Sequence, residues 1–286
     1  MTQSEGQFEP LHEGHAIDHV LFAVQFARPL PEGAFSRAEM QRLHNRVRKM
    51  LPRGGEEQSI DVTVPNLTLD QPAATKASIS AFFFDRVRPD GHPGIQLRVE
   101  RQLITLRHTQ YSRWDAVTRE VYRLLEEACA LFTTSQIPPV SVGLTYLDTF
   151  VWMHSDGPPR VSELLQPPGR SQWIAPVVYN TQEQWHSHAG VFQRLDDHVR
   201  RLVNVNLDDV HLQTPEGEQR RGISVAIVLT DAINQSGYIP TEVDPRDAYK
   251  WARIRFEMLH SENKRLMGEV ISEAIAARIN LGGASE

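Results

Sequence analysis

The stretch that decides the fold runs from Leu97 to Trp152 and has the sequence LRVERQLITLRHTQYSRWDAVTREVYRLLEEACALFTTSQIPPVSVGLTYLDTFVW. Its first part has apolar residues at every second position, which predicts strands over about 94–100 and 102–108. Its middle has apolar residues at helical spacing, which predicts a helix from Trp114 to about Phe132 with Ser112 and Asp115 as its cap. Alternation returns in VSVGLTY, so a further strand is expected.

Similar patterns extend in both directions from this stretch. Further strands are expected over 17–27 and over about 59–65, 78–88, 172–180, 188–195, 199–212 and 222–233. Ser36 and Glu39 form a capping box that predicts a helix ending near Pro52. Asp244 and Pro245 predict the start of a last helix, which runs to about Asn280 with a bend near Gly268.

Strands and helices do not alternate in βαβ units along this chain. The order therefore predicts an α+β fold with mainly antiparallel sheet, in two strand-rich halves covered by long helices. The expected organisation is a flexible N-terminus over 1–15, an N-terminal half over 16–153 and a C-terminal half over 172–286. The segment 154–171 holds two Pro-Pro pairs and two glycines, and it is predicted to join the halves.

The composition limits the class of protein. The 286 residues carry a net charge of −6 and one cysteine, Cys129, so an internal disulfide and a thiolate zinc site are excluded. No signal peptide is visible in residues 1–15, and no segment has the roughly 20 apolar residues of a membrane span. We expect a cytoplasmic protein that does not interact with membranes.

Four segments, IDHVLFAVQFARPL, LRVERQLITLRHTQYSRWDAVTREVYRLLE, VGLTYLDTF and FEMLHSENKRLMGEVISEAI, occur in an order that resembles one family. It comprises sporadically distributed prokaryotic proteins, somewhat shorter than this chain, whose hallmark strand is close to GLRYIN. Here Thr145 stands where arginine is usual, and Leu147 and Asp148 replace the isoleucine-asparagine pair. The family has no established activity, and its patchy distribution implies mobile or defence-associated genes.

Common catalytic motifs are missing. The sequence contains no GxxxxGK[ST], GxGxxG, GxSxG or HExxH. Their absence argues against the usual nucleotide hydrolases, dinucleotide enzymes, serine hydrolases and zinc proteases. We therefore expect no cofactor, and a non-catalytic protein is favoured over an enzyme.

His186 and His188 are the candidate metal ligands. Residues two apart on a strand point to the same face, so both imidazoles could bind one metal ion. A third ligand would have to come from Asp196, Asp197, His198 or His211. The alternative is an exposed hairpin edge with ordinary polar residues.

Two basic or polar clusters are candidate binding surfaces. Arg42, Arg46, Lys49 and Arg53 are spaced so that a helix would place them on one stripe, able to bind an acidic protein, a phosphate or nucleic acid. The alternative is a solvated helix face.

His260, Glu262, Asn263 and Lys264 fall within one turn of the last predicted helix and could form a polar network or an interface. The alternative is a solvated helix face on which His260 and Lys264 are simply neighbours four residues apart. For three other groups of polar residues we favour a structural role. The histidines and acids of 12–19 are expected in a solvated segment, and the alternating Asn204, Asn206 and Asp208 on a half-solvated strand face. Cys129 is expected to be a buried thiol.

The leading hypothesis is a non-catalytic binding or assembly protein with a protein partner, or a homo-oligomer. The reason is that the sequence pattern predicts its strands and helices clearly but contains no recognisable catalytic site. One alternative is an enzyme, or a protein that binds a small ligand or a metal, with a pocket near His186 and His188. Another is nucleic-acid binding through the stripe from Arg42 to Arg53.

Overall fold

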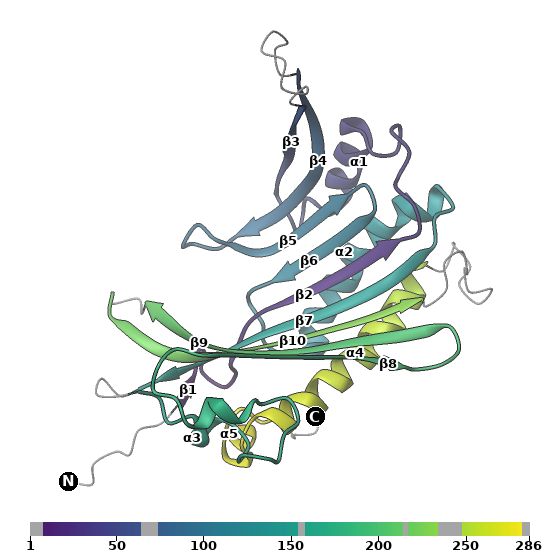
Figure 1. The fold of residues 1–286 in the computed structure, drawn as a ribbon. Helices are drawn as coiled ribbons and strands as arrows, with labels where there is room; N and C mark the ends of the chain where they lie inside the picture. Colours follow the sequence, from purple (N-terminus) through teal and green to yellow (C-terminus); the bar gives the residue numbers. More distant parts are fainter. Residues whose placement is uncertain (1–7, 64–73, 154–157, 214–216, 234–247, 282–286) are drawn as a thin grey trace, which may run out of the picture.

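The computed structural model describes residues 8–63, 74–153, 158–213, 217–233 and 248–281 (Figure 1). Within these residues the chain forms one sheet of ten strands in which every strand pair is antiparallel. The strands are β1 (Phe8–Pro10), β2 (Ile17–Phe26), β3 (Arg53–Thr63), β4 (Ala74–Val87), β5 (Pro93–Glu100), β6 (Leu103–His108), β7 (Pro139–Trp152), β8 (His186–Arg194), β9 (Val199–Gln213) and β10 (Gln219–Ile233). The helices are α1 (Arg37–Val47), α2 (Trp114–Thr134), α3 (Val161–Leu164), the 3₁₀ helix η1 (Pro176–Tyr179), α4 (Ala248–Val270) and α5 (Glu273–Arg278).

The order of strands across the sheet is β3-β4-β5-β6-β2-β7-β10-β9-β8, with β1 paired to one end of β7. Strand β7 is central, because it pairs with β2 on one side and with β10 on the other. The two ranges predicted as halves therefore contribute strands to one continuous sheet. The expectation of an α+β fold with mainly antiparallel sheet is confirmed.

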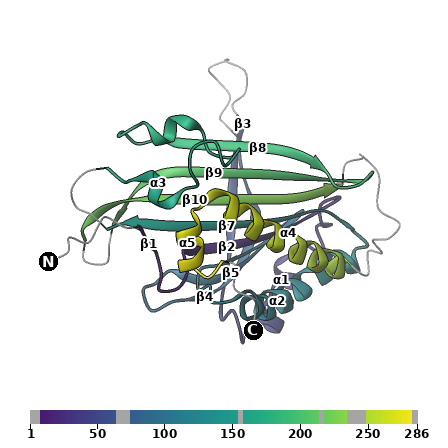
Figure 2. The same cartoon turned by 90° about the horizontal axis from the view of Figure 1, so that it is seen from below.

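The sheet twists strongly, so that β8, β9 and β10 are seen edge-on in Figure 1 while β2 to β6 are seen face-on. Helix α4 lies across the part of the sheet formed by β7 and β10, as the view from below shows (Figure 2). Helix α2 packs against β6 and against α4, and α1 packs against α2. These three helices bury one face of the sheet.

The core between sheet and helices follows from alternation. Phe22 of β2 and Leu144 of β7 are paired neighbours that point toward the helices, and both are fully buried. Val121 of α2 and Phe256 of α4 meet them from the helical side, with the rings of Phe22 and Phe256 at 5.1 Å. Burial of such apolar side chains is the main stabilising contribution to a fold of this kind.

The predicted capping box of α1 is only half formed. The hydroxyl of Ser36 accepts a hydrogen bond from the backbone N–H of Glu39 at 3.4 Å, as predicted. The Glu39 carboxylate pairs with Arg42 instead of reaching back to the Ser36 backbone. The predicted cap of α2 is wrong, because Arg113 occupies the N-cap position and no side chain caps the helix.

The strand predicted over 172–180 is wrong. A 3₁₀ helix occupies Pro176–Tyr179. Proline has no N–H to donate to a strand partner, and the N–H of Ala175 donates to the hydroxyl of Ser187 instead of to a ladder.

The prediction of a single last helix that runs to about Asn280 is also wrong. Helix α4 ends at Val270, and Ser272 caps the separate helix α5 by accepting from the N–H of Ile275. The side-chain amide of Gln166 donates to the carbonyl of Ile271 at 2.8 Å, which fixes the end of α4. The predicted helix start at 244–245 lies outside the described residues.

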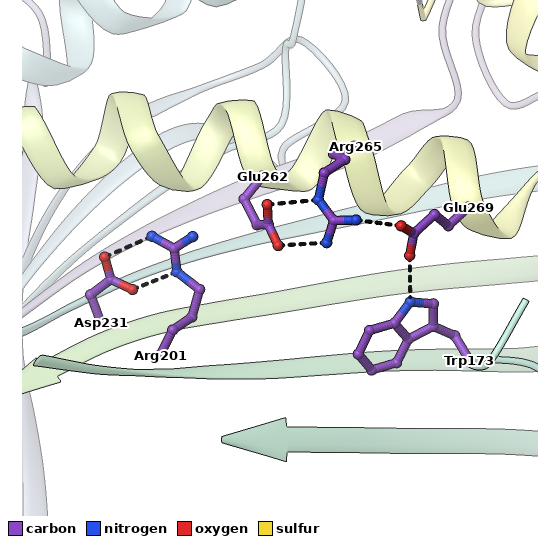
Figure 3. Close-up of polar contacts among 6 residues, drawn as sticks. All are labelled: Trp173, Arg201, Asp231, Glu262, Arg265 and Glu269. Atoms are coloured by element: carbon purple, nitrogen blue, oxygen red, sulfur yellow. Dashed lines mark hydrogen bonds and ion pairs between the residues drawn. The ribbon is translucent and has the colours of Figure 1, made fainter. Parts of the chain in front are cut away.

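Figure 3 shows two polar networks, one within the sheet between β9 and β10 and one that ties α4 to the segment before β8. Arg201 of β9 makes two hydrogen bonds to the carboxylate of Asp231 on β10, at 2.7 and 2.9 Å. On α4, Arg265 binds both Glu262 and Glu269. Glu269 in turn accepts a 2.9 Å hydrogen bond from the indole N–H of Trp173, so the rotational setting of α4 is fixed along this length.

None of the helices in the described ranges has both the length and the apolar character needed to span a membrane.

Candidate functional site

A cavity of about 740 Å³ lies between the first turn of α2, the middle of α4 and the facing ends of β2 and β7. Its wall combines aromatic rings with polar side chains. Its members include His15, Tyr111, Trp114, Tyr146, Asp148, Glu257, His260, Asn263 and Lys264. They come from four segments that are far apart in the sequence.

Asp148 is brought into this cavity by the alternation of β7. Val142, Leu144 and Tyr146 point toward the helices, and Asp148 is the next residue on that face. Its side chain sits beside an irregularity in β2, where the register with β7 shifts between Ile17 and His19. A carboxylate therefore occupies a position where the pattern of the strand favours an apolar residue.

The carboxyl group of Asp148 is buried and lacks a full set of partners. The residue is 3% exposed, and its Oδ2 atom has no hydrogen-bond partner among the described residues. Burial raises the pKa of this carboxyl to about 7, because a low-dielectric environment disfavours the charged form. Asp148 is thus an acid that titrates near neutral pH inside a cavity.

Tyr146 links β7 to α4 through His260. The Tyr146 hydroxyl and the Nδ1 atom of His260 are 2.9 Å apart. Burial, with a smaller contribution from the charge of Lys264, lowers the pKa of His260 to about 4. The imidazole is therefore neutral at pH 7, and its Nδ1 can accept a hydrogen bond from the Tyr146 hydroxyl.

Trp114 covers His260 from the side of α2. The two rings are stacked, with centroids 4.0 Å apart and an angle of 5° between their planes. The indole N–H of Trp114 donates to Glu257 at 2.7 Å, and the Tyr122 hydroxyl donates to the other oxygen of the same carboxylate at 2.7 Å. Glu257 thus holds the start of α2 against α4 and fixes this wall of the cavity.

Tyr111 extends the same network toward the N-terminal segment. Its hydroxyl is hydrogen-bonded with Tyr146, and burial raises its pKa to about 12. Burial also raises the pKa of Tyr146 well above its ordinary value. The ring of His15 contacts Tyr111 edge-on at 5.8 Å. Tyr111, Tyr146 and His260 therefore form a chain of neutral hydrogen-bonding groups at neutral pH.

Asn263 is another lining residue with a buried polar atom that lacks a partner, as is His15 through its Nδ1 atom, among the described residues. Asn263 is 5% exposed, and its Oδ1 atom has no hydrogen-bond partner within the described part of the chain. Its neighbours in sequence, Glu262 and Arg265, belong to the network that fixes α4 (Figure 3). The position of Asn263 at the cavity is therefore set by the helix.

Of the residues predicted from sequence, His260 and Lys264 both line this cavity. His15, which the sequence placed in a solvated segment, lines it as well, and a tight turn with backbone bonds between His12 and His15 holds it there. The sequence did not single out Tyr111 or Trp114 for function, and Asn263 enters only as one member of the polar set around His260. The signal that could have located the site was Asp148, a carboxylate at an inward position of a buried strand.

The structure places His186 and His188 on β8, away from the lining of the cavity. They share one face of the strand, with ring centroids 5.3 Å apart, as predicted. His188 pairs with Asp208 of β9 at 2.9 Å. Among the described residues there is no group of three or more His, Cys, Asp or Glu that could hold a metal ion, so binding of a metal by these two histidines stays a prediction.

The prediction that Arg42, Arg46, Lys49 and Arg53 form a stripe on one helix is wrong. Helix α1 ends at Val47, so Lys49 lies beyond the helix and Arg53 is the first residue of β3. Arg42 pairs with Glu39, and Arg46 donates to Glu127 of α2 at 2.7 Å.

Arg53 makes two hydrogen bonds, of 2.7 and 2.9 Å, to the buried carboxylate of Asp85. Three of the four cations are thus already paired with carboxylates of this chain.

Cys129 is buried within α2, as predicted. Burial raises the pKa of its thiol to about 12, so the reactive thiolate is not formed at neutral pH.

No protein-family model matches the chain, and no curated protein matches it. The resemblance to the sporadically distributed family stays a prediction that depends on the four segments quoted above.

Proposed function

We propose that this protein is a non-catalytic binding protein that holds a small ligand in the cavity between α2, α4 and β7. The observation that carries the proposal is that Asp148 and Asn263 both line the cavity, and that each has a buried side-chain oxygen, Oδ2 and Oδ1 respectively, with no hydrogen-bond partner among the described residues. A buried polar atom left unpaired costs about 1–3 kcal/mol. A ligand that pairs with both oxygens recovers that energy.

The size and wall of the cavity support the same proposal. Its volume of about 740 Å³ lies within the range of small-molecule sites, and such sites combine aromatic walls with a few well-placed polar groups. The polar groups are held in place, because Glu257 and the Tyr146–His260 contact tie three elements together.

The protonation states of the cavity argue against nucleophilic catalysis. Nucleophilic catalysis requires a group that is activated by a base or a lowered pKa. Here Tyr111, Tyr146 and His260 are all held in their neutral forms, and the one cysteine is buried elsewhere. The arrangement offers hydrogen bonds at fixed positions.

We expect that at least one of three simple probes, benzylamine, benzyl alcohol and benzoate, binds saturably in isothermal titration calorimetry. Replacing Ala116, an exposed residue of α2 at the cavity, with tryptophan should weaken that binding by about tenfold or more because the indole occupies the entrance. The matched control is Ala130→Trp, at an exposed position of the same helix outside the lining. Binding that A116W and A130W affect equally, or no saturable binding of any probe, would contradict the proposal.

A second candidate function, self-association, is favoured by the free edge of the sheet. Strand β8 is the last strand of the order and pairs only with β9 within the described residues. Its Phe192 is 62% exposed, and the preceding residue, Val191, is also an exposed apolar residue. An exposed apolar edge strand is a template for pairing with a second copy, and two such edges can pair about a twofold axis.

We expect light scattering after size-exclusion chromatography to give twice the mass of one chain at micromolar concentration. Phe192→Lys should shift the protein to a monomer, because charge on an edge strand opposes pairing. Ile254→Lys, at an exposed apolar position on α4, is the control and should leave the mass unchanged. A monomeric wild-type protein would rule out this candidate.

A further inference from the structure

We infer that the ligand carries a positively charged primary ammonium group, which binds at the inner end of the cavity between Asp148 and Asn263. This inference rests on the proposed function and adds the chemical class of the ligand. It depends on where the two unpaired oxygens lie, on the chemistry that can satisfy both, and on the charges around them.

The two oxygens belong to facing elements that run in the same direction. The ring of Phe256 on α4 contacts Phe22, which is the register partner of Leu144 on β7. Further along both elements, His260 of α4 meets Tyr146 of β7 at 2.9 Å.

The next inward residues on the two elements are Asn263 and Asp148. Asn263 lies about 4.5 Å along the helix from His260, and Asp148 lies about 6.6 Å along the strand from Tyr146. Both line the same cavity. Asn263 and Asp148 therefore lie at about the same level on opposite walls.

A carboxylate and a carboxamide oxygen are both hydrogen-bond acceptors, so the group between them must donate at least two hydrogen bonds. A primary ammonium group has three N–H donors, and a charge-assisted bond to a carboxylate is about twice as strong as a neutral one. A neutral hydroxyl has a single donor. An anion has none and would be repelled by ionised Asp148.

The aromatic wall supports a cation as well. Tyr111 and Tyr146 lie next to Asp148, and their rings contact each other edge-on at 6.0 Å. Trp114 lies 6.5 Å from Tyr146, but its ring is stacked with His260 and with Phe22, so it does not present a free face to a cation. Aromatic faces stabilise cations by about 0.5–2 kcal/mol when water is largely excluded.

The cations that line the cavity set the direction of the ligand. Arg113 and Arg119 are exposed, and Arg119 already donates to the carbonyl of Asp115. Lys264 is half-buried and lies close enough to His260 to lower its pKa. Two further carboxylates line the cavity: Asp115 is exposed, and Glu257 already accepts hydrogen bonds from Trp114 and Tyr122. An ammonium group is therefore directed to the buried Asp148, and the neutral part of the ligand faces the arginines.

The test uses calorimetry with benzylamine, which is cationic at about pH 8, and with benzyl alcohol and benzoate as neutral and anionic counterparts of similar shape. We expect benzylamine to bind about tenfold more tightly than benzyl alcohol, and benzoate to bind least. Asp148→Asn should weaken benzylamine binding by about tenfold, which corresponds to about 1.4 kcal/mol, and should change benzyl alcohol binding by less than about threefold.

Three further variants make the test independent of any one substitution. Asn263→Ala should weaken benzylamine binding. Lys264→Gln should tighten benzylamine binding about two- to fivefold, because a repulsive charge is removed. Asp208→Asn, which removes a carboxylate from β9 that lies outside the lining of the cavity, should leave all three affinities unchanged.

The outcomes separate this inference from the proposed function. If benzyl alcohol or benzoate binds in a way that A116W abolishes while benzylamine does not bind, the ammonium inference is wrong and the binding function stands. If benzylamine binds equally well to D148N, K264Q and the wild type, the inference is wrong as well. If no probe binds, both are contradicted.

Discussion

Replacing Arg201 with alanine is expected to lower the free energy of unfolding by about 3–5 kcal/mol. Arg201 is 6% exposed and its partner Asp231 is 0% exposed, and the guanidinium makes two hydrogen bonds to the carboxylate (Figure 3). Without Arg201, the cation that remains beside the buried charge of Asp231 among the described residues is Arg255, whose nearest nitrogen is 3.5 Å away. Denaturation in urea, with an unchanged slope, is the measurement.

Two further variants control this prediction. Arg194→Ala removes an arginine that pairs with Asp197 on the exposed surface, so the free energy of unfolding should change by less than about 1 kcal/mol. The double variant Arg201→Leu with Asp231→Leu should recover much of the loss, because an apolar pair leaves no charge unpaired. If R201A is no more costly than R194A, the buried pair does not stabilise the fold as argued.

The elements that could be predicted from sequence are those whose signal is local. The alternation of Val203, Val205 and Leu207 gives β9, and that of Ile223, Val225 and Ile227 gives β10. The two strands pair with Val205 opposite Ile227, as expected for a hairpin whose apolar faces share one core. The N-cap Ser36 is local in the same way, since it depends on residues three apart.

The elements that were predicted wrongly depend on distant contacts. The pattern of 172–180 resembles a strand, but the indole of Trp173 is tied to Glu269 of α4 and the N–H of Ala175 to Ser187. Likewise, α4 ends where it does because Gln166 binds the carbonyl of Ile271. Neither partner is visible from the short-range periodicity of the chain.

The candidate site was only partly predictable for the same reason. His260 and Lys264 could be selected because they lie one helical turn apart. Asp148 and Asn263 come together only because α4 lies along β7, and the sequence contains no signal for the way a helix is laid on a sheet. Nothing local in the sequence distinguishes an inward carboxylate such as Asp148 from an exposed one.

Asp148 also makes the stability depend on pH in an unusual direction. Its pKa is about 7 in the folded protein and about 3.9 in an unfolded chain. Between these values the folded state binds a proton that the unfolded state does not, so the free energy of unfolding falls as pH rises. The contribution is fully present below about pH 4 and is lost as pH rises through about 7; its size is on the order of 4 kcal/mol.

His260 acts with the opposite sign and must be separated from Asp148. Its pKa is lowered to about 4, so the folded state binds fewer protons than the unfolded state up to about pH 6.5. The free energy of unfolding gains from this group as pH rises, and the two effects offset each other in the wild-type protein. The measured quantity is therefore the difference between the wild type and Asp148→Asn, since His260 is present in both.

Urea denaturation of both proteins at about pH 5, 6, 7 and 8 should show the wild type losing stability relative to D148N, by about 1.4 kcal/mol per pH unit below pH 7 and less above it. At about pH 8 the variant should be the more stable protein, because asparagine places no charge in the cavity. Asp197→Asn, at an exposed carboxylate that pairs with Arg194, should show no such trend. A difference in stability between the wild type and D148N that stays constant from pH 5 to 8 would mean that Asp148 titrates like a carboxyl in water. The cavity would then not be the low-dielectric site on which ammonium binding depends.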